Sequence, residues 1–254
     1  MTLSPRQIGL AAAALAVVVV AALGLWLANR GPELVFVDRG EPPGFRNLVY
    51  AGAASEGVSP IAPIAPAAAG ATPPPAPEDI CAALFSDTAD PRLGAGAPVV
   101  AFFTDYRCPY CREMGRMLIE RAKAGEITVI FKEWPVLGPP SVTAARAALA
   151  AARQGQGAFL KAHERLTMSP FVPNAAYARD LARWYGLDSD RLLADFDGAE
   201  VAAQVERIDV LAEALGFQGV PGLVVGRTVA LRALDEESLD ALIAAERELG
   251  PPPC

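Results

Sequence analysis

The stretch PVVAFFTDYRCPYC, residues 98–111, decides the fold of this chain. Its first seven residues are an apolar run of strand length, which is typical of a strand buried within a sheet. Two cysteines, Cys108 and Cys111, follow with two residues between them. Residues 112–124 then carry apolar side chains at helical spacing. The stretch therefore predicts a buried strand that leads through a cysteine loop into a helix.

The segments after this stretch add further strands. Residues 127–131 form a β-branched run, and a strand, a helix and a strand joined by a short turn make a parallel pair with a right-handed crossover. Two short apolar runs, 223–225 and 229–231, flank Gly226-Arg227. They predict a hairpin with glycine at the position that needs a positive φ.

The remaining segments are helical. Five helices are expected between the second strand and the hairpin, at 141–154, 157–168, 174–185, 188–196 and 199–215. A last helix is expected at 236–249, with Asp235 as its N-cap. The order βαβ, helices, ββα is typical of an α/β thioredoxin fold with a helical insertion, here at about 141–215.

Residues 8–28 carry no charge and are almost entirely apolar. As a helix they would span roughly 31 Å, enough to cross a bilayer core, and Trp26 suits the interfacial aromatic belt. The alternative is a cleaved signal peptide, but its apolar region is shorter and residues 25–29 make a poor cleavage site. We expect residues 1–7 in the cytoplasm and a single-pass anchor in the inner membrane, with the rest of the chain in the periplasm or an equivalent extracytoplasmic space.

Residues 29–77 are expected to form an extracytoplasmic linker. Alanine and proline dominate residues 51–77, and such proline density favours an extended, semi-rigid spacer over a packed core. Within the preceding segment, Val35-Phe36-Val37 either adds a short strand or packs on a partner. The thioredoxin-like domain is expected at 78–254.

Composition excludes several classes of function. The net charge is −7, and the few basic residues are scattered, so nucleic acid is not an expected partner. The single histidine, His163, argues against a histidine-rich metal site, and it is expected at the surface or partly buried. We expect no cofactor and no metal, so the chemistry depends on the four cysteines.

The position of Cys108 predicts a reactive thiol. A cysteine at the start of a helix lies beside unpaired N–H groups and the positive end of the helix dipole, which favour a thiolate. The pKa of Cys108 should therefore lie below that of a free cysteine. Pro109 suits the first helical turn, and Cys111 lies one turn further on. We assign Cys108 as the nucleophile and Cys111 as the thiol that resolves a mixed disulfide.

The cysteine pair has two other interpretations. It is half of a zinc site if further ligands come from Cys81, Cys254 or His163, although these are far apart in the sequence. It is a purely structural disulfide if neither thiol reacts. The position between a strand and a helix favours the redox interpretation over both.

Three segments resemble the DsbA family of extracytoplasmic thiol–disulfide oxidoreductases: FTDYRCPYC at 103–111, FKEWPVLGPPS at 131–141 and GVPG at 219–222. The resemblance extends over residues 98–249. It implies a thioredoxin fold with a helical insertion. It also implies that Pro221 belongs to a cis-proline loop that faces the cysteines and leaves nearby backbone free to pair with substrate.

Two residues depart from the family pattern. Many members have a buried glutamate six residues before the first cysteine, where this chain has Phe102. Proton transfer would then fall to Asp105, Lys132, Glu133 or water, and each of these charges is otherwise a solvated surface residue. The strongly oxidising members have Pro-His between the cysteines where this chain has Pro109-Tyr110, which predicts weaker oxidising power.

Two further expectations concern residues outside the motif. Cys81 and Cys254 either pair in an oxidising compartment or remain free thiols that can link two chains. Trp134 and Val220, with the segment 135–137, either form an apolar surface that accepts unfolded substrate or belong to the core.

The sequence therefore predicts an enzyme that exchanges disulfides with unfolded or thiol-containing protein substrates, most simply an oxidase that a membrane redox partner recycles. A reductase or isomerase of the same fold is the alternative within the class. A non-catalytic membrane-tethered chaperone or assembly factor and a metal carrier are the alternatives outside it.

Overall fold

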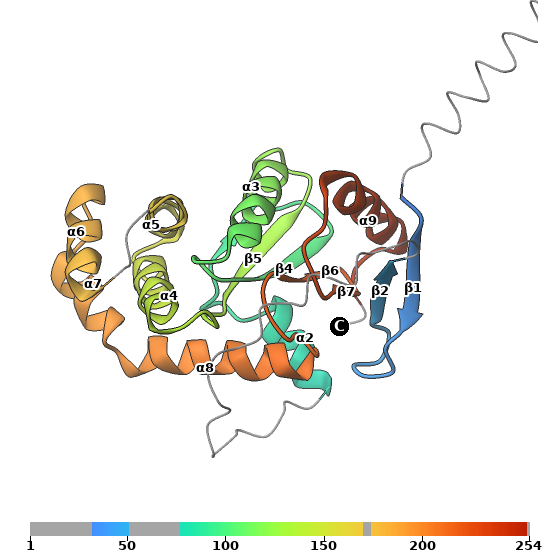
Figure 1. The fold of residues 1–254 in the computed structure, drawn as a ribbon, viewed down its shortest axis with the longest axis horizontal. Helices are drawn as coiled ribbons and strands as arrows, with labels where there is room; N and C mark the ends of the chain where they lie inside the picture. The colour runs from blue at the N-terminus through green and yellow to red at the C-terminus, as the bar shows by residue number, and fades with distance from the viewer. Residues whose placement is uncertain (1–31, 51–76, 170–173, 253–254) are drawn as a thin grey trace, which may run out of the picture. The chain divides into compact units, whose positions relative to one another are not determined.

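A mixed sheet runs through the described residues of this computed structural model, which are 32–50, 77–169 and 174–252. Within them the sheet has seven strands in the order β1-β2-β7-β6-β4-β5-β3 (Figure 1). None of the helices in these ranges is long and apolar enough to cross a membrane. The predicted anchor at 8–28 and residues 51–76 of the predicted linker lie outside the described residues.

The predicted βαβ unit is confirmed. Strand β4 (Val99–Thr104) leads into helix α3 (Pro109–Lys123), and β5 (Thr128–Glu133) pairs parallel to β4. Helix α3 begins three residues earlier than predicted, because Pro109 occupies its first turn. Strand β5 extends two residues beyond the predicted Phe131, so that Lys132 and Glu133 are strand residues.

The predicted hairpin and last helix are also present. Strands β6 (Gly222–Val225) and β7 (Thr228–Ala230) are antiparallel, and Gly226 in their turn has a φ of 54°. Helix α9 (Glu236–Leu249) begins after Asp235, whose side chain accepts a hydrogen bond from the backbone N–H of Ser238. The short strand β3 (Arg92–Leu93) pairs antiparallel to β5 at the edge of the sheet.

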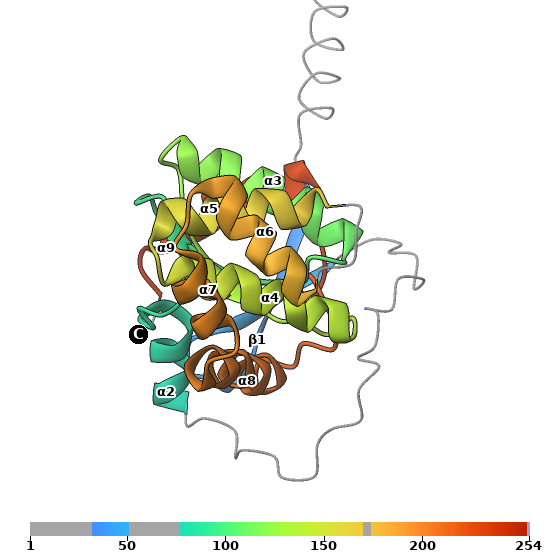
Figure 2. The same cartoon turned by 90° about the vertical axis from the view of Figure 1, so that its left-hand side faces the viewer.

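Helices cover both faces of the sheet (Figure 1). Helices α3 and α9 lie on one face, and α2 (Pro77–Phe85) and α8 (Ala199–Ala214) lie on the other. The insertion between β5 and β6 adds four more helices, which pack against one another beside the sheet (Figure 2): α4 (Pro139–Ala152), α5 (Gln156–Thr167), α6 (Ala175–Tyr185) and α7 (Ser189–Phe196). With α8 they are the five helices that the sequence predicts.

The predicted linker is wrong over part of its length. Strands β1 (Leu34–Asp38) and β2 (Arg46–Tyr50) form an antiparallel pair, and β2 joins β7 in parallel. The described residues from Leu34 onward accordingly belong to one compact unit. The physical reason is an ion pair across the junction, in which Arg46 reaches the buried carboxylate of Glu246 on α9 at 2.6 Å. Of the two interpretations of Val35-Phe36-Val37, the strand is correct.

Candidate active site

The two cysteines lie at the start of α3, where the strand–loop–helix pattern placed them. Cys108 is the N-cap residue of the helix, and its Sγ accepts a hydrogen bond from the backbone N–H of Cys111 at 3.2 Å. Both thiols are free and both residues are buried. The sequence between them is more open, because Pro109 and Tyr110 are exposed. The structure therefore shows a reduced dithiol at a helix N-terminus.

The two thiols have opposite acidities. The hydrogen bond from the Cys111 thiol, together with the N–H groups of Cys111 and Tyr110, lowers the pKa of Cys108, although burial opposes this. Burial and the neighbouring Cys108 raise the pKa of Cys111 far above that of a free thiol. A thiolate at Cys108 and a protonated thiol at Cys111 are the forms that the site favours at neutral pH.

The loop before β6 approaches the nucleophile from across the sheet. The peptide bond between Val220 and Pro221 is cis. The carbonyl oxygen of Val220 lies 3.7 Å from Sγ of Cys108 and accepts a hydrogen bond from that thiol. The expected cis-proline loop thus faces the cysteines, as the resemblance implies.

Asp105 holds the cysteine loop in place. Its Oδ1 accepts hydrogen bonds from the backbone N–H of Arg107 at 2.8 Å and from the Ser141 hydroxyl at 2.8 Å. Its Oδ2 accepts from the backbone N–H of Leu137 at 3.0 Å. Burial raises the pKa of Asp105, and these hydrogen bonds oppose the rise. The carboxylate therefore ties the loop before α3 to the start of α4.

A second buried polar cluster lies beside the cysteines. The hydroxyl of Tyr106 lies 2.8 Å from Oε1 of Glu133 and 2.9 Å from Nδ1 of His163. Burial raises the pKa of Glu133 to about 8 and lowers the pKa of His163 to about 4. At neutral pH the buried carboxyl therefore keeps its proton, and the imidazole is uncharged.

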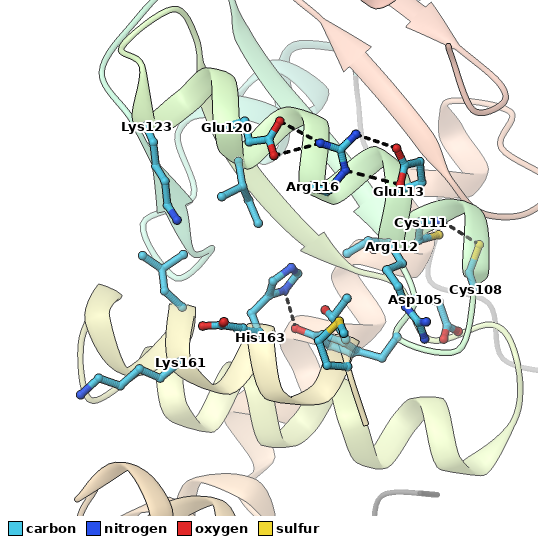
Figure 3. Close-up of a pocket in the computed structure, with 17 residues that line it drawn as sticks. Asp105, Cys108, Cys111, Arg112, Glu113, Arg116, Glu120, Lys123, Lys161 and His163 are labelled. Atoms are coloured by element: carbon cyan, nitrogen blue, oxygen red, sulfur yellow. Dashed lines mark hydrogen bonds and ion pairs between the residues drawn. The ribbon is translucent and has the colours of Figure 1, made fainter. Parts of the chain in front are cut away.

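A cavity of about 580 Å³ opens between α3 and α5 (Figure 3). Cys108 and Cys111 line one end, and Tyr106 and His163 line the wall formed by α5 and the cysteine loop. Charged side chains of α3 line the opposite wall, where Arg116 forms exposed ion pairs with Glu113 and Glu120. Both cysteines thus line the same cavity as Tyr106 and His163, two members of the buried cluster.

Comparisons with known proteins agree with this geometry. The family model described as a DSBA-like thioredoxin domain matches residues 99–245, which is more than half of the chain. The chain belongs to this family. Together with the cysteine pair, this makes the protein a thiol–disulfide oxidoreductase. No curated protein matches the sequence.

Three solved structures are similar to about two thirds of the chain. A thioredoxin-like oxidoreductase from Silicibacter pomeroyi is 35% identical, with a TM-score of 0.60 over 66% of this chain and 97% of the other. The catalytic domain of Proteus mirabilis ScsC is 28% identical, with a TM-score of 0.60 over 66% and 95%. A periplasmic thioredoxin-like protein from Salmonella enterica is 29% identical, with a TM-score of 0.57 over 66% and 95%.

All three charges considered for proton transfer are buried in this DsbA-like domain: Asp105, Lys132 and Glu133. Lys132 and Glu133 lie on opposite faces of the sheet. Glu133 points toward α5, as described. The neighbouring Lys132 points the other way, since side chains alternate along a strand. Its ammonium group forms an ion pair with buried Asp90 and donates to the carbonyl of Ala83 in α2. The interpretation of these charges as solvated surface residues is wrong for all three.

The expected apolar surface around Cys108 is mostly core. Trp134 is 3% exposed, packs against Phe103 and Phe217, and donates its Nε1–H to Asp209 on α8 at 2.7 Å. Val220 is 5% exposed. The side chains of residues 135–137 are partly exposed. Substrate contact at this place would therefore involve residues 135–137 and the Val220 backbone more than the indole of Trp134.

No motif in the sequence pointed to roles for Tyr106 and His163. His163 is also buried rather than at the surface, at 6% exposed. Phe159, Ala162, His163 and Leu166 follow a helical period and are all buried in α5. That spacing is the sequence signal from which the burial of His163 could have been predicted.

Cys81 in α2 is disulfide-bonded. Cys254 lies outside the described residues, so the pairing of these two cysteines stays a prediction. In the described part of the chain, no three histidine, cysteine or carboxylate side chains cluster in a way that could hold a metal ion.

Proposed function

We propose that this protein is an extracytoplasmic dithiol oxidase that donates the Cys108–Cys111 disulfide to thiol-containing or unfolded protein substrates. A substrate thiolate attacks Sγ of Cys108, the bond to Cys111 breaks, and Cys111 leaves as a thiolate that takes up a proton. A second substrate thiolate then attacks the substrate sulfur of the mixed disulfide and releases the Cys108 thiolate. The substrate gains a disulfide, and two electrons remain on the protein for a membrane redox partner to remove.

The opposite acidities of the two thiols are the observation that carries the proposal. Interactions that stabilise the Cys108 thiolate also stabilise the reduced protein, so they make the disulfide a better oxidant. The N-cap position and the N–H groups of Tyr110 and Cys111 provide this stabilisation. Cys108 is also the better leaving group when the second substrate thiol attacks, because a thiol of lower pKa leaves faster.

The redox equilibrium of the cysteine pair tests this proposal. The full-length protein in detergent is equilibrated with glutathione at graded ratios, and free thiols are alkylated and counted by mass spectrometry. Reference potentials run from about −120 mV for strong oxidants to about −270 mV for thioredoxin. A potential above roughly −180 mV supports the oxidase. A value near −270 mV, roughly that of thioredoxin, would instead make the protein a reductase supplied with electrons from across the membrane.

Substitution of each cysteine separates the enzyme from a binding protein of the same fold. We expect Cys108→Ser to abolish oxidation of a reduced test protein. Cys111→Ser should accumulate a mixed disulfide with the disulfide-bonded form of the test protein, because the Cys108 thiolate attacks that disulfide, releases one test-protein thiolate, and has no resolving thiol beside it. A chaperone or assembly factor would keep its activity in both variants, and that result would overturn the oxidase.

We also propose a single-pass anchor at residues 8–28 with the catalytic domain outside the cytoplasm. The uncharged apolar length of this segment supports it. So does the disulfide at Cys81, since structural disulfides persist in oxidising compartments. The similar protein from Salmonella enterica is described as periplasmic.

Cell fractionation tests the location. The protein should remain with membranes after alkaline extraction, and protease added to spheroplasts should remove the domain that carries Cys108. Release by alkaline extraction would contradict the anchor. Protection from protease in intact spheroplasts, with digestion after lysis, would contradict the extracytoplasmic side.

A further inference from the structure

Two buried side chains and one half-buried side chain, that of Tyr106, form a continuous hydrogen-bonded path beside the cysteines. Glu133 on β5 is fully buried, and the Tyr106 hydroxyl connects its Oε1 to Nδ1 of His163 on α5 at 2.8 and 2.9 Å. Within the described residues, the second carboxyl oxygen of Glu133 is buried and has no hydrogen-bond partner. Such an uncompensated buried carboxyl is costly, so its retention calls for a role.

Nε2 of His163 is the end of this path, and it lies beside α3, the helix that carries Cys111. His163 lines the cavity together with both cysteines (Figure 3). Its Nε2 lies 4.0 Å from the position that a Cβ on Gly115 would occupy. Gly115 follows Cys111 by four residues in α3, so the two lie on the same face of that helix, one turn apart. His163 and Cys111 line the same cavity, whose volume of about 580 Å³ is large enough to hold water.

The path has two protonation states that differ by one proton. In the first, Glu133 is protonated and donates to the Tyr106 oxygen, the Tyr106 hydroxyl donates to Nδ1, and Nε2 carries a hydrogen. In the second, Nδ1–H donates to Tyr106, Tyr106 donates to the Glu133 carboxylate, and Nε2 has a lone pair. A tyrosine hydroxyl has a single proton and accepts as well as donates, so it suits both states.

We propose that Glu133, Tyr106 and His163 form a proton relay that protonates Cys111 when it leaves as a thiolate and takes the proton back when Cys111 must attack. When Nε2–H gives its proton across the cavity, the Tyr106 proton moves to Nδ1 and the Glu133 proton moves to Tyr106. One proton arrives at Cys111, one negative charge arrives at Glu133, and no group changes its oxidation state. This inference rests on the proposed function, because it assigns the proton of the Cys111 step.

The pKa shifts of Glu133 and His163 agree with transfer of a proton from the path to Cys111. Burial keeps Glu133 protonated to about pH 8 and His163 uncharged above about pH 4, so the first state is the neutral resting form. Charged groups from three elements line the cavity together with His163: Asp105 on the cysteine loop, Arg112, Glu113, Arg116, Glu120 and Lys123 on α3, and Lys161 and Glu164 on α5. Asp90, on the far side of β5, adds to the rise in the Glu133 pKa.

The variant Tyr106→Phe tests the relay, because it removes the connecting hydroxyl and keeps the ring. The full-length oxidised protein in detergent is mixed with excess glutathione, acid-quenched at intervals, and assayed for loss of the Cys108–Cys111 disulfide between pH 5 and 9. Rates are divided by the glutathione thiolate concentration. We expect Tyr106→Phe to be about tenfold slower or more near pH 7, since general acid catalysis typically contributes about 10²–10⁴-fold.

The pH profile separates a relay from a structural effect. The wild-type rate should fall as pH rises through about 8, where Glu133 loses its proton. Tyr106→Phe and Glu133→Gln should both lack this inflection. Glu133→Gln keeps the shape of the side chain and supplies no transferable proton, so it serves if Tyr106→Phe fails to fold. The matched control is Tyr177→Phe, which removes a buried hydroxyl without a hydrogen-bond partner in the described structure and should match the wild type.

Two results would overturn the relay. One is a wild-type rate and profile in both variants, and the other is a loss by the same factor at every pH. The failure of the proposed function would look different, because it appears in the glutathione equilibrium of the wild-type protein, as a potential near about −270 mV, whatever the rate of Tyr106→Phe.

Discussion

Tyr110 is half exposed in the first turn of α3, next to the Cys108 thiolate. Its ring places no positive charge beside that sulfur. We predict that Tyr110→His makes the protein more oxidising, because a partly protonated imidazole favours the thiolate. One unit of decrease in the Cys108 pKa corresponds to about 1.4 kcal/mol, or about 30 mV for this two-electron couple. Glutathione equilibria measure the shift. Tyr110→Phe is the control, and a shift of equal size in that variant would contradict the charge argument.

Lys132 and Asp90 form a buried ion pair between β5 and the loop after α2, and Gln204 on α8 donates to the same carboxylate at 3.0 Å. We predict that Lys132→Met destabilises the protein by about 3–5 kcal/mol, because an unpaired carboxylate stays buried. Urea unfolding measures the loss. The second change Asp90→Asn should restore part of the stability, and strict additivity of the two changes would contradict direct coupling. Arg116→Ala, which removes only exposed ion pairs, is the control and should leave the unfolding midpoint close to wild type.

The predictability of single residues depended on how local their interactions are. The roles of Cys108 and Cys111 follow from two positions in one loop and the helix after them. The Tyr106 hydrogen bonds reach 27 residues to Glu133 and 57 residues to His163, so no short pattern contains them. The burial of Lys132 depends on Asp90, which lies 42 residues away. Lys132 and Glu133 are charged and lie at a strand end, so the sequence suggested that they are exposed to solvent. The helices that bury them come from distant parts of the chain.

Strands β1 and β2 show that whole elements are also hard to predict when their position depends on distant parts of the chain. The helices of the insertion were predictable from their own periodicity and end signals, such as Asn174 and Asp188, whose side chains cap α6 and α7. The β1–β2 pair has only five-residue strands, and an alanine- and proline-rich stretch separates it from the rest. Its place in the sheet depends on the distant partner strand β7.

This pair should matter for stability. We predict that a chain beginning at Pro77 is less stable and less soluble than one beginning at Leu34, because it exposes β7 as a sheet edge. Thermal unfolding and light scattering compare the two chains. The point variant Arg46→Gln isolates the ion pair with Glu246 and should cost about 2–3 kcal/mol, less than a fully buried pair because Arg46 is partly exposed. Equal stability of the two truncated chains would show that β1 and β2 do not stabilise the rest of the sheet.

At the scale of the whole molecule, the groups that serve the active site also set how stability depends on pH. The ordinary pKa of the carboxyl of Glu133 is 4.5, and burial raises it to about 8. Over that window the unfolded chain has released a proton that the folded chain still holds, so stability falls as pH rises. The ordinary pKa of His163 is 6.5, and burial lowers it to about 4. Over that window the unfolded chain binds a proton that the folded chain does not, so stability falls as pH falls.

The two effects oppose each other between about pH 4.5 and 6.5, and only Glu133 acts from there to about 8. We predict that Glu133→Gln removes the loss of stability that accompanies a rise in pH above 6.5. Below pH 6.5 this variant should lose stability as pH falls, because His163 then acts alone. In His163→Gln, stability should fall as pH rises from about 4.5 to 6.5, because Glu133 then acts alone. Above pH 6.5 its pH dependence should match the wild type. Urea unfolding of the three proteins between pH 4 and 9 measures these slopes. A constant difference between Glu133→Gln and the wild type across the range would mean that Glu133 has the same pKa in the folded and unfolded chains, and the neutral resting form of the relay would then be wrong.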